Sequence, residues 1–222
     1  SKDGASYSGT AEVTVKAKSA VLTGKRSATE ALGSTTKDSA KVTLTTTGAA
    51  VLKATDGSTI LQSGASNVAL SAKTLTINEA GTASKAISLK DTSQLSITAT
   101  DDATIYGAVV GTAGTAISAN TKTLTLDDAS GFLGTFNQTA GTTSITGAKY
   151  FGGKVNVQGG SIETDDVVLT DTTTIGQSHA QSGNASFKAK SVTLGEATTD
   201  DAQAKDGTFK TEQNGVATID TL

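Results

Sequence analysis

The chain has 222 residues and a formal net charge of −3, and only 36% of its residues are hydrophobic and 4% aromatic. This composition excludes a thick core of bulky side chains and favours a narrow core of Val, Leu, Ile and Ala. One arginine and evenly spread lysines argue against the clustered basic face of a nucleic-acid-binding protein. The lack of cysteine excludes disulfides, zinc fingers and thiol catalysis.

Short strands with alternating apolar residues recur along the whole chain. They carry Thr or Ser between or beside the inward residues, and no proline interrupts them, which suits long hydrogen-bonded ladders. The last inward residues of successive copies are spaced by about 25 residues on average. These marker residues are Leu22, Leu44, Ile77, Ile97, Leu126, Ile145, Leu169, Leu194 and Ile219.

A period-2 pattern repeated at this spacing predicts a stacked β architecture and excludes a helical repeat. One coil cannot bury its inward residues alone, whereas stacking at ~4.8 Å per coil pairs every backbone group. We therefore expect an all-β parallel β-helix of about nine coils, spanning 1–222 as one elongated domain. Its predicted core includes Leu75, Ile77, Leu124, Leu126, Val192 and Leu194. The alternative is an antiparallel β-sandwich, although Asn-Gly and Asp-Gly hairpin signals are few.

Two segments depart from the strand pattern. Residues 27–32 contain a Ser-x-x-Glu capping box, which indicates a short helical insert or end cap. Residues 132–160 hold four of the eight aromatic side chains and two Gly-Gly pairs, so we expect an insert or a wider coil there.

Residues for catalysis are scarce. The only imidazole, His179, lies in a polar run and is interpreted as an exposed loop residue. The six glutamates are scattered singly, without the paired carboxylates and aromatic groove that a glycan-cleaving β-helix needs. We expect no enzymatic activity.

Paired aspartates suggest a cation site. Asp101 and Asp102, like Asp127 and Asp128, follow a marker strand, so adjacent coils would stack the two pairs at one corner. Four carboxylates with nearby carbonyls would suit Ca²⁺, which takes six to eight oxygen ligands. Solvated corner acids are the competing interpretation, and we expect no other cofactor.

Outward Thr and Ser residues form the other regular feature. Pairs at 43/45, 74/76, 96/98, 123/125, 144/146 and 191/193 are expected to stack into two ladders on one flat face. Thr74, Thr76, Thr123 and Thr125 are the predicted binding residues of that face. The competing interpretation is that Thr, which has a high β-propensity, covers a solvated sheet.

The strands Ala-Lys-Thr-Leu-Thr-Ile (72–77) and Thr-Lys-Thr-Leu-Thr-Leu (121–126), the Gly, Asn and Asp corners and the lack of Cys and Pro resemble bacterial surface β-solenoids. The likeness is to autotransporter passengers and secreted adhesins, and the composition is also similar to surface-layer proteins. The resemblance implies a non-catalytic displayed rod for adhesion or self-association. The alternatives are a subunit of a self-assembling surface layer or filament, and an ice- or glycan-binding β-solenoid.

The same resemblance implies a secreted or cell-surface location. Expected partners are other copies of the chain, a host or neighbouring cell surface, or a glycan. The chain contains no Met, so we expect that a leader was removed or that these residues are part of a longer protein. No apolar run approaches the ~20 residues of a membrane helix, so we expect any anchor to lie outside this chain.

Overall fold

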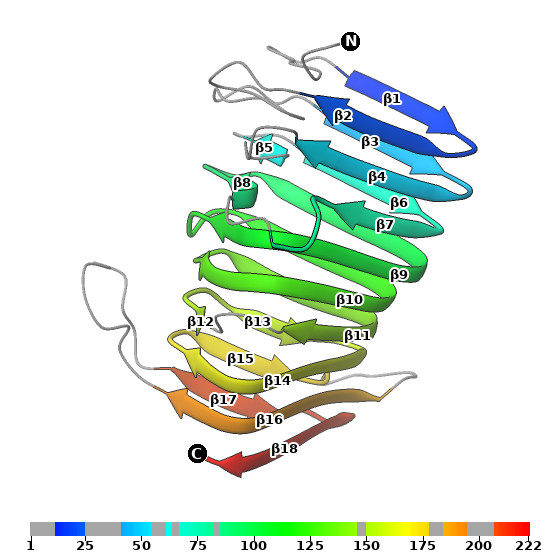
Figure 1. The fold of residues 1–222 in the computed structure, drawn as a ribbon. Coiled ribbons are helices and arrows are strands. Elements are labelled where there is room, and N and C mark those ends of the chain that lie inside the picture. The colour runs from blue at the N-terminus through cyan, green and yellow to red at the C-terminus, as the bar shows by residue number, and fades with distance from the viewer. Residues whose placement is uncertain are drawn as a thin grey trace.

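The computed structural model describes residues 12–24, 41–54, 61–63, 67–81, 85–145, 150–177, 184–194 and 207–222. Its strands wind around a common interior and form a rod, with the first and last described strands at opposite ends (Figure 1). Every strand pairing among the described residues is parallel. The predicted parallel β-solenoid is confirmed, and the antiparallel sandwich is excluded.

The described strands make nine successive coils, as the repeat spacing predicts. Coil 1 contains β1 (Glu12–Ala17) and β2 (Ala20–Gly24); coil 2 contains β3 (Lys41–Thr46), β4 (Ala49–Ala54) and β5 (Leu61–Ser63); coil 3 contains β6 (Asn67–Ala72), β7 (Thr74–Ile77) and β8 (Lys85–Leu89). Coils 4 and 5 are the long bent strands β9 (Gln94–Gly111) and β10 (Ala116–Phe132). Coil 6 contains β11 (Thr135–Ile145) and β12 (Tyr150–Phe151); coil 7 contains β13 (Val155–Val157) and β14 (Gly160–Leu169); coil 8 contains β15 (Thr172–Ile175) and β16 (Ala185–Leu194); coil 9 contains β17 (Thr208–Thr211) and β18 (Gly215–Thr221).

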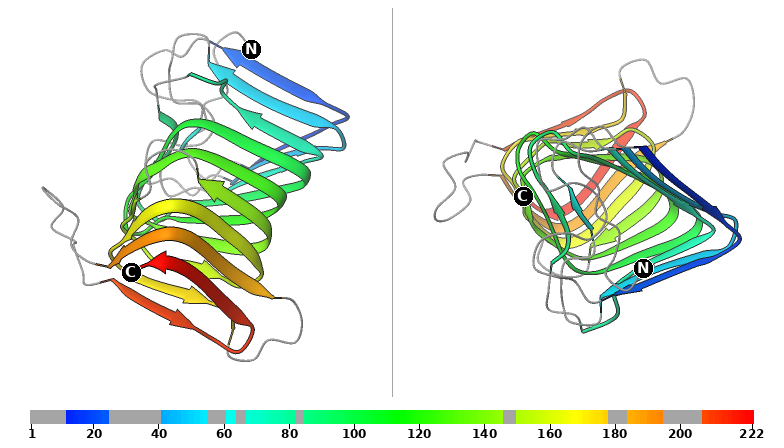
Figure 2. Two further views of the ribbon diagram at one scale, coloured as in Figure 1. Left: turned by 60° about the horizontal axis from the view of Figure 1, so that its bottom comes forward. Right: turned by 90° about the horizontal axis from the view of Figure 1, so that it is seen from above.

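The coils share three faces, which are seen along the rod in Figure 2. Face A consists of β1, β3, β6, the first parts of β9, β10 and β11, and β13, β15 and β17. Face B consists of β2, β4, β7, the middle of β9 and β10, the end of β11, the first parts of β14 and β16, and β18. Face C consists of β5, β8, β12 and the ends of β9, β10, β14 and β16.

The strand register aligns residues into columns along face B. One column, called here the outer column, passes through all nine coils, and its described side chains point outward. It contains Val21, Val51, Thr76, Thr104, Thr125, Ser144, Glu163, Lys188 and Thr218. Successive members are between 19 and 30 residues apart. The coil length is therefore about 25 residues on average, but it varies because the corners differ in length.

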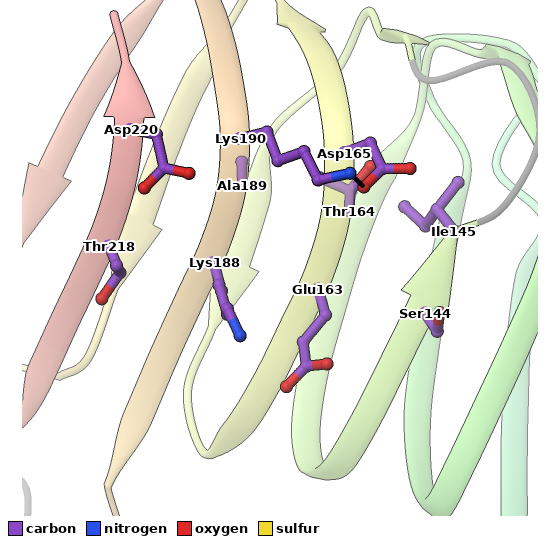
Figure 3. A pocket seen from close by; sticks show the side chains of 10 residues that line it. All are labelled: Ser144, Ile145, Glu163, Thr164, Asp165, Lys188, Ala189, Lys190, Thr218 and Asp220. Atoms are coloured by element: carbon purple, nitrogen blue, oxygen red, sulfur yellow. Dashed lines mark ion pairs between the residues drawn. The ribbon is translucent and has the colours of Figure 1, made fainter.

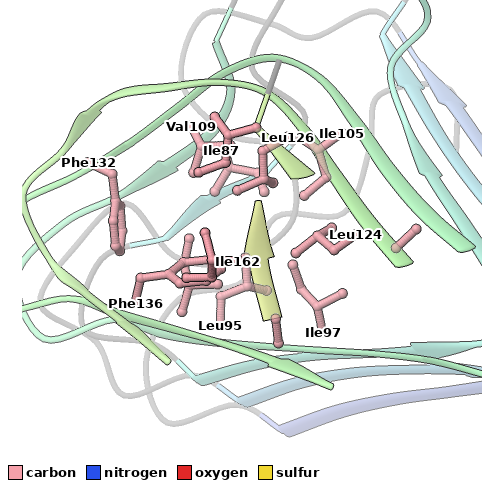
Figure 4. Close-up of a cluster of buried hydrophobic side chains, with 14 of the residues drawn as sticks. Ile87, Leu95, Ile97, Ile105, Val109, Leu124, Leu126, Phe132, Phe136 and Ile162 are labelled. Atoms are coloured by element: carbon pink, nitrogen blue, oxygen red, sulfur yellow. The ribbon is translucent and has the colours of Figure 1, made fainter. Parts of the chain in front are cut away.

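Leu, Ile, Val and Phe side chains from successive coils fill the interior (Figure 4). The alternation predicted from sequence decides which residues enter it: β7 alternates half-buried Thr74 and Thr76 with buried Leu75 and Ile77. Five of the six predicted core residues are at most 2% exposed, namely Leu75, Ile77, Leu124, Leu126 and Val192. The sixth, Leu194 near the C-terminal end, is half-buried and packs against this core.

The marker residues chosen from sequence do not form one column. Leu44 and Ile97 lie on face A, and Leu169 and Leu194 lie on face C. The true column beside the outer column contains Leu22, Leu52, Ile77, Ile105, Leu126, Ile145, Thr164, Ala189 and Ile219. Each coil presents two or three similar strands, so a single strand pattern identifies the coil but not its face.

The aromatic segment 132–160 is part of the stack. Its described residues form β11, β12 and β13, and Phe132, Phe136 and Phe151 are each 1% exposed. The rings of Phe136 and Phe151 lie 5.8 Å apart between centroids, because neighbouring coils bring them together. The expected insert or wider coil is therefore corrected: these phenylalanines fill the core. The predicted helical segment 27–32 lies outside the described residues.

Candidate functional site

Face B carries a regular array of small hydroxyl groups over coils 3 to 6, called here the hydroxyl array. Its two outward columns contain seven hydroxyl side chains and one carboxylate, namely Thr74, Thr76, Asp102, Thr104, Thr123, Thr125, Thr142 and Ser144. The described strands hold these residues at fixed spacing, ~4.8 Å between coils and ~6.8 Å between columns. The array is therefore a rigid and nearly flat polar surface.

The four predicted binding residues all belong to this array. Thr74 and Thr76 come from coil 3, whereas Thr123 and Thr125 come from coil 5. Thr104 of coil 4 lies between Thr76 and Thr125 in the register. All four predicted residues are half-buried and alternate with core residues, so their side chains point outward.

Other Thr and Ser pairs named from sequence lie elsewhere. The pairs 43/45 and 96/98 belong to face A, and the pair 191/193 belongs to face C. The expectation of two ladders made of all six pairs is corrected accordingly. The array gains instead Thr104 and Thr142, which the sequence pattern did not single out, and Ser161 extends it by donating a hydrogen bond of 2.9 Å to Thr142 Oγ1.

The two aspartate pairs lie at different corners of the rod. Asp102 is opposite Thr123 in the register, beside the corner between faces A and B. Asp127 and Asp128 follow the face B strand of the next coil and lie at the corner between faces B and C. Four residues of extended chain, ~13 Å, separate Thr123 from Asp127. The register therefore does not bring the four carboxylates to one corner, contrary to the calcium prediction.

Two of these aspartate side chains have other partners. Asp101 Oδ2 lies 3.7 Å from the ammonium of Lys73, and Asp127 Oδ2 accepts a 3.2 Å hydrogen bond from the Gly107 amide. No group of three or more His, Cys, Asp or Glu residues is arranged to hold a metal ion in the described part of the chain. His179 lies outside the described residues, so its predicted loop position stays a prediction.

A hollow of about 360 Å³ lies on face B beyond the hydroxyl array, at coils 6 to 9 (Figure 3). Its lining combines hydroxyls with both signs of charge. Coil 7 contributes Glu163 and Asp165, and coil 8 contributes Lys188 and Lys190. The hollow thus continues the hydroxyl array on the same face with charges of both signs.

One charge pair in the hollow is closed. The ammonium of Lys190 lies 2.9 Å from Asp165 Oδ1, and this hydrogen bond and the charge of Asp165 raise the pKa of Lys190, with smaller contributions from Asp166 and Asp220. A raised lysine pKa adds stability that persists at neutral pH and is lost only in strongly alkaline solution. Both partners are well exposed, so the pair contributes little to folding.

The spacing of opposite charges in the sequence indicates the hollow, although no known motif does. Twenty-five residues separate Glu163 from Lys188, and the same number separate Asp165 from Lys190. That separation equals the mean coil length, so it predicts that the two acids and the two bases lie side by side on adjacent coils. Searching for opposite charges at the coil spacing would have found them.

Comparison with protein families, curated proteins and solved structures finds no match to this chain. None of the described segments forms a helix with the length and apolar character that crossing a bilayer requires.

Proposed function

We propose that this chain is a non-catalytic, exported rod that mediates adhesion or self-association through a lateral face. The observation that supports this proposal is the hydroxyl array, in which two columns of short side chains continue in register over four coils of face B. Such a surface offers many equivalent polar groups at a regular spacing rather than one pocket.

The chemistry of the array suits contact with an extended polar partner. Each hydroxyl can donate one hydrogen bond and accept others, so the array matches glycan hydroxyls or the polar face of another strand stack. Threonine side chains are stiff at χ1, so they lose little conformational freedom when a partner binds. Individual contacts of this kind are weak, but a repeated surface on many displayed copies binds through their sum.

Lysine substitution of Thr74, Thr76, Thr123 and Thr125 together is expected to reduce adhesion or self-association at least tenfold while sparing the fold. Lysine is the suitable charge because Asp102 lies opposite Thr123, so the new ammonium at that position meets a carboxylate rather than a like charge. The measurement is the aggregation of beads or cells that display the chain, with circular dichroism and the unfolding midpoint recorded for each variant.

A matched control places four lysines with the same spacing on face A, at Ala69, Ser71, Ser118 and Asn120 of coils 3 and 5. This control adds the same charge to outward positions of the same coils. Full adhesion by the face B variant, or an equal loss in both variants, would show that the hydroxyl array is not the contact surface.

A further inference from the structure

Four charges of face B form an antisymmetric pattern about a line between coils 7 and 8. Coil 7 presents two acids at i and i+2, Glu163 and Asp165, and coil 8 presents two bases at the same spacing, Lys188 and Lys190. Glu163 lies opposite Lys188 in the strand register. Each of these two acids therefore has a base at the corresponding position on the other coil, and Asp220 of coil 9 lies outside this pattern.

The Glu163–Lys188 pair is open. Within the described residues neither side chain makes a hydrogen bond or an ion pair, although the two lie on neighbouring strands. Figure 3 shows both side chains projecting from face B beside the hollow, whereas Lys190 reaches Asp165. An exposed carboxylate and an exposed ammonium are thus both available to a partner with the reverse arrangement.

The uncharged residues around this pair follow the same symmetry. In the outer column, Ser144 precedes Glu163 and Thr218 follows Lys188, so a hydroxyl stands at each end. In the neighbouring column, Ser161 and Ser186 occupy coils 7 and 8. Read in either direction along the rod, the outer column presents hydroxyl, charge, opposite charge and hydroxyl.

We propose that this surface binds a second copy of the chain with the two rods antiparallel and related by a twofold axis. The inference rests on the proposed function, because it names a partner for lateral face B. The contact uses coils 6 to 9 and leaves the hydroxyl residues of coils 3 to 5 to other contacts. A twofold axis across the rod, between coils 7 and 8, places Glu163 opposite Lys188 of the second copy and Lys188 opposite Glu163 of the second copy. Such an isologous contact uses the same patch on both chains.

The charge pattern also selects the orientation. With the rods parallel and facing each other, the twofold axis would run along the rod and Glu163 would face Glu163 of the second copy. Like charges would then oppose one another on both coils, which disfavours that arrangement. The antiparallel arrangement additionally places Ser144 opposite Thr218 of the second copy and Ser161 opposite Ser186 of the second copy.

The contact is small, which sets how it must be measured. Four coils at ~4.8 Å and five residues of width at ~3.3 Å give a patch of about 19 Å by 17 Å. Stable complexes bury about 800 Å² on each partner, so a single contact is weak. Many copies displayed on one surface would bind through avidity. Beads coated with the full chain are therefore the right system, and their aggregation should weaken as ionic strength rises.

Charge-reversal variants test the reciprocal contact. Beads carrying Glu163→Lys should not aggregate with one another, because the introduced ammonium would face Lys188 of the second copy, and beads carrying Lys188→Glu should fail in the same way. Mixing the two kinds of beads should restore aggregation, because each reversed charge then meets its opposite. The double variant Glu163→Lys/Lys188→Glu should aggregate by itself, within about threefold of the wild-type rate.

A cysteine experiment tests orientation separately from charge. The chain has no native cysteine, so every disulfide formed comes from the introduced residues. A mixture of chains carrying Ser161→Cys and chains carrying Ser186→Cys should give mixed disulfide dimers in preference to either homodimer.

The control for the charge-reversal variants is Lys53→Glu. This substitution also reverses a charge, but Lys53 and its partner Glu79 on coil 3 lie away from the hollow.

The outcomes separate this inference from the proposed function. If neither the single reversals nor their mixture differ from wild type, while four lysines in the hydroxyl array abolish aggregation, the reciprocal contact is wrong and the lateral-face function stands. Homodimers of Ser161→Cys in preference to mixed dimers would overturn the antiparallel arrangement. If both the array variant and the charge variants aggregate normally, both proposals fail.

Discussion

Replacement of Leu126 by alanine is expected to lower the free energy of unfolding by about 2–5 kcal/mol, the range for deleting a buried large side chain. Leu126 is 2% exposed and lies between Ile105 and Ile145 in the inward column of face B. The ladders above and below hold the backbone at the coil spacing, so the coils cannot close the cavity left by three lost carbons. Urea unfolding followed by circular dichroism measures the change.

The neighbouring outward residue supplies the control. Thr125→Ala alters the same strand in the same coil, but its side chain is half-buried on the outer surface. That change should alter stability by no more than about 0.5 kcal/mol. A loss below that value for Leu126→Ala as well would mean that the strand does not contribute to the core, and the register of face B would be wrong.

The fold could be predicted because two sequence signals agree. The alternation of apolar and hydroxyl residues decides which side chains face inward, and the spacing of about 25 residues indicates a stack of coils. Both signals come from local patterning, and both survive in the structure: nine coils are formed, and Leu75 and Leu124 are buried at equivalent positions.

The face of each strand could not be predicted in the same way. Coils 5 and 6 advance along the outer column by only 19 residues, whereas others advance by 30, because the corners differ in length. Counting a fixed period therefore drifts from one face to another, as it did at Leu44 and Leu169. The same error brought the two aspartate pairs to one corner in the sequence interpretation.

Hydroxyl residues of the candidate site could be predicted from the sequence, but its charged hollow was not. The strands that carry the predicted binding residues are copies of one sequence pattern, so these residues could be grouped from the sequence. The register places all four on face B, namely Thr74, Thr76, Thr123 and Thr125. The charged hollow needed knowledge of which residues meet across coils, which only the register supplies. The aromatic residues led to a wrong expectation, since Phe132 and Phe136 suggested an insert or a wider coil but fill the interior.

Replacement of Gly141 by alanine is expected to cost roughly 3 kcal/mol or more, from a left-handed backbone and from overpacking. Gly141 lies at the corner between faces A and B with φ of 74°, and a Cβ there would overlap the carbonyl oxygen of Thr121 in the coil above. The corner cannot shift easily, because the buried Gln138 amide donates hydrogen bonds to the carbonyls of Ala140 (2.5 Å) and Gly141 (3.1 Å).

Gly81 separates the two causes of this cost. Its φ is also left-handed, at 83°, but a Cβ there would meet nothing within 4 Å. Gly81→Ala should therefore lose only the ~1–2 kcal/mol of an alanine held in the left-handed region. Urea unfolding of both variants gives the comparison. The difference between the two losses measures the contact between the corners of coils 5 and 6, and equal losses would mean that these corners are not packed against each other.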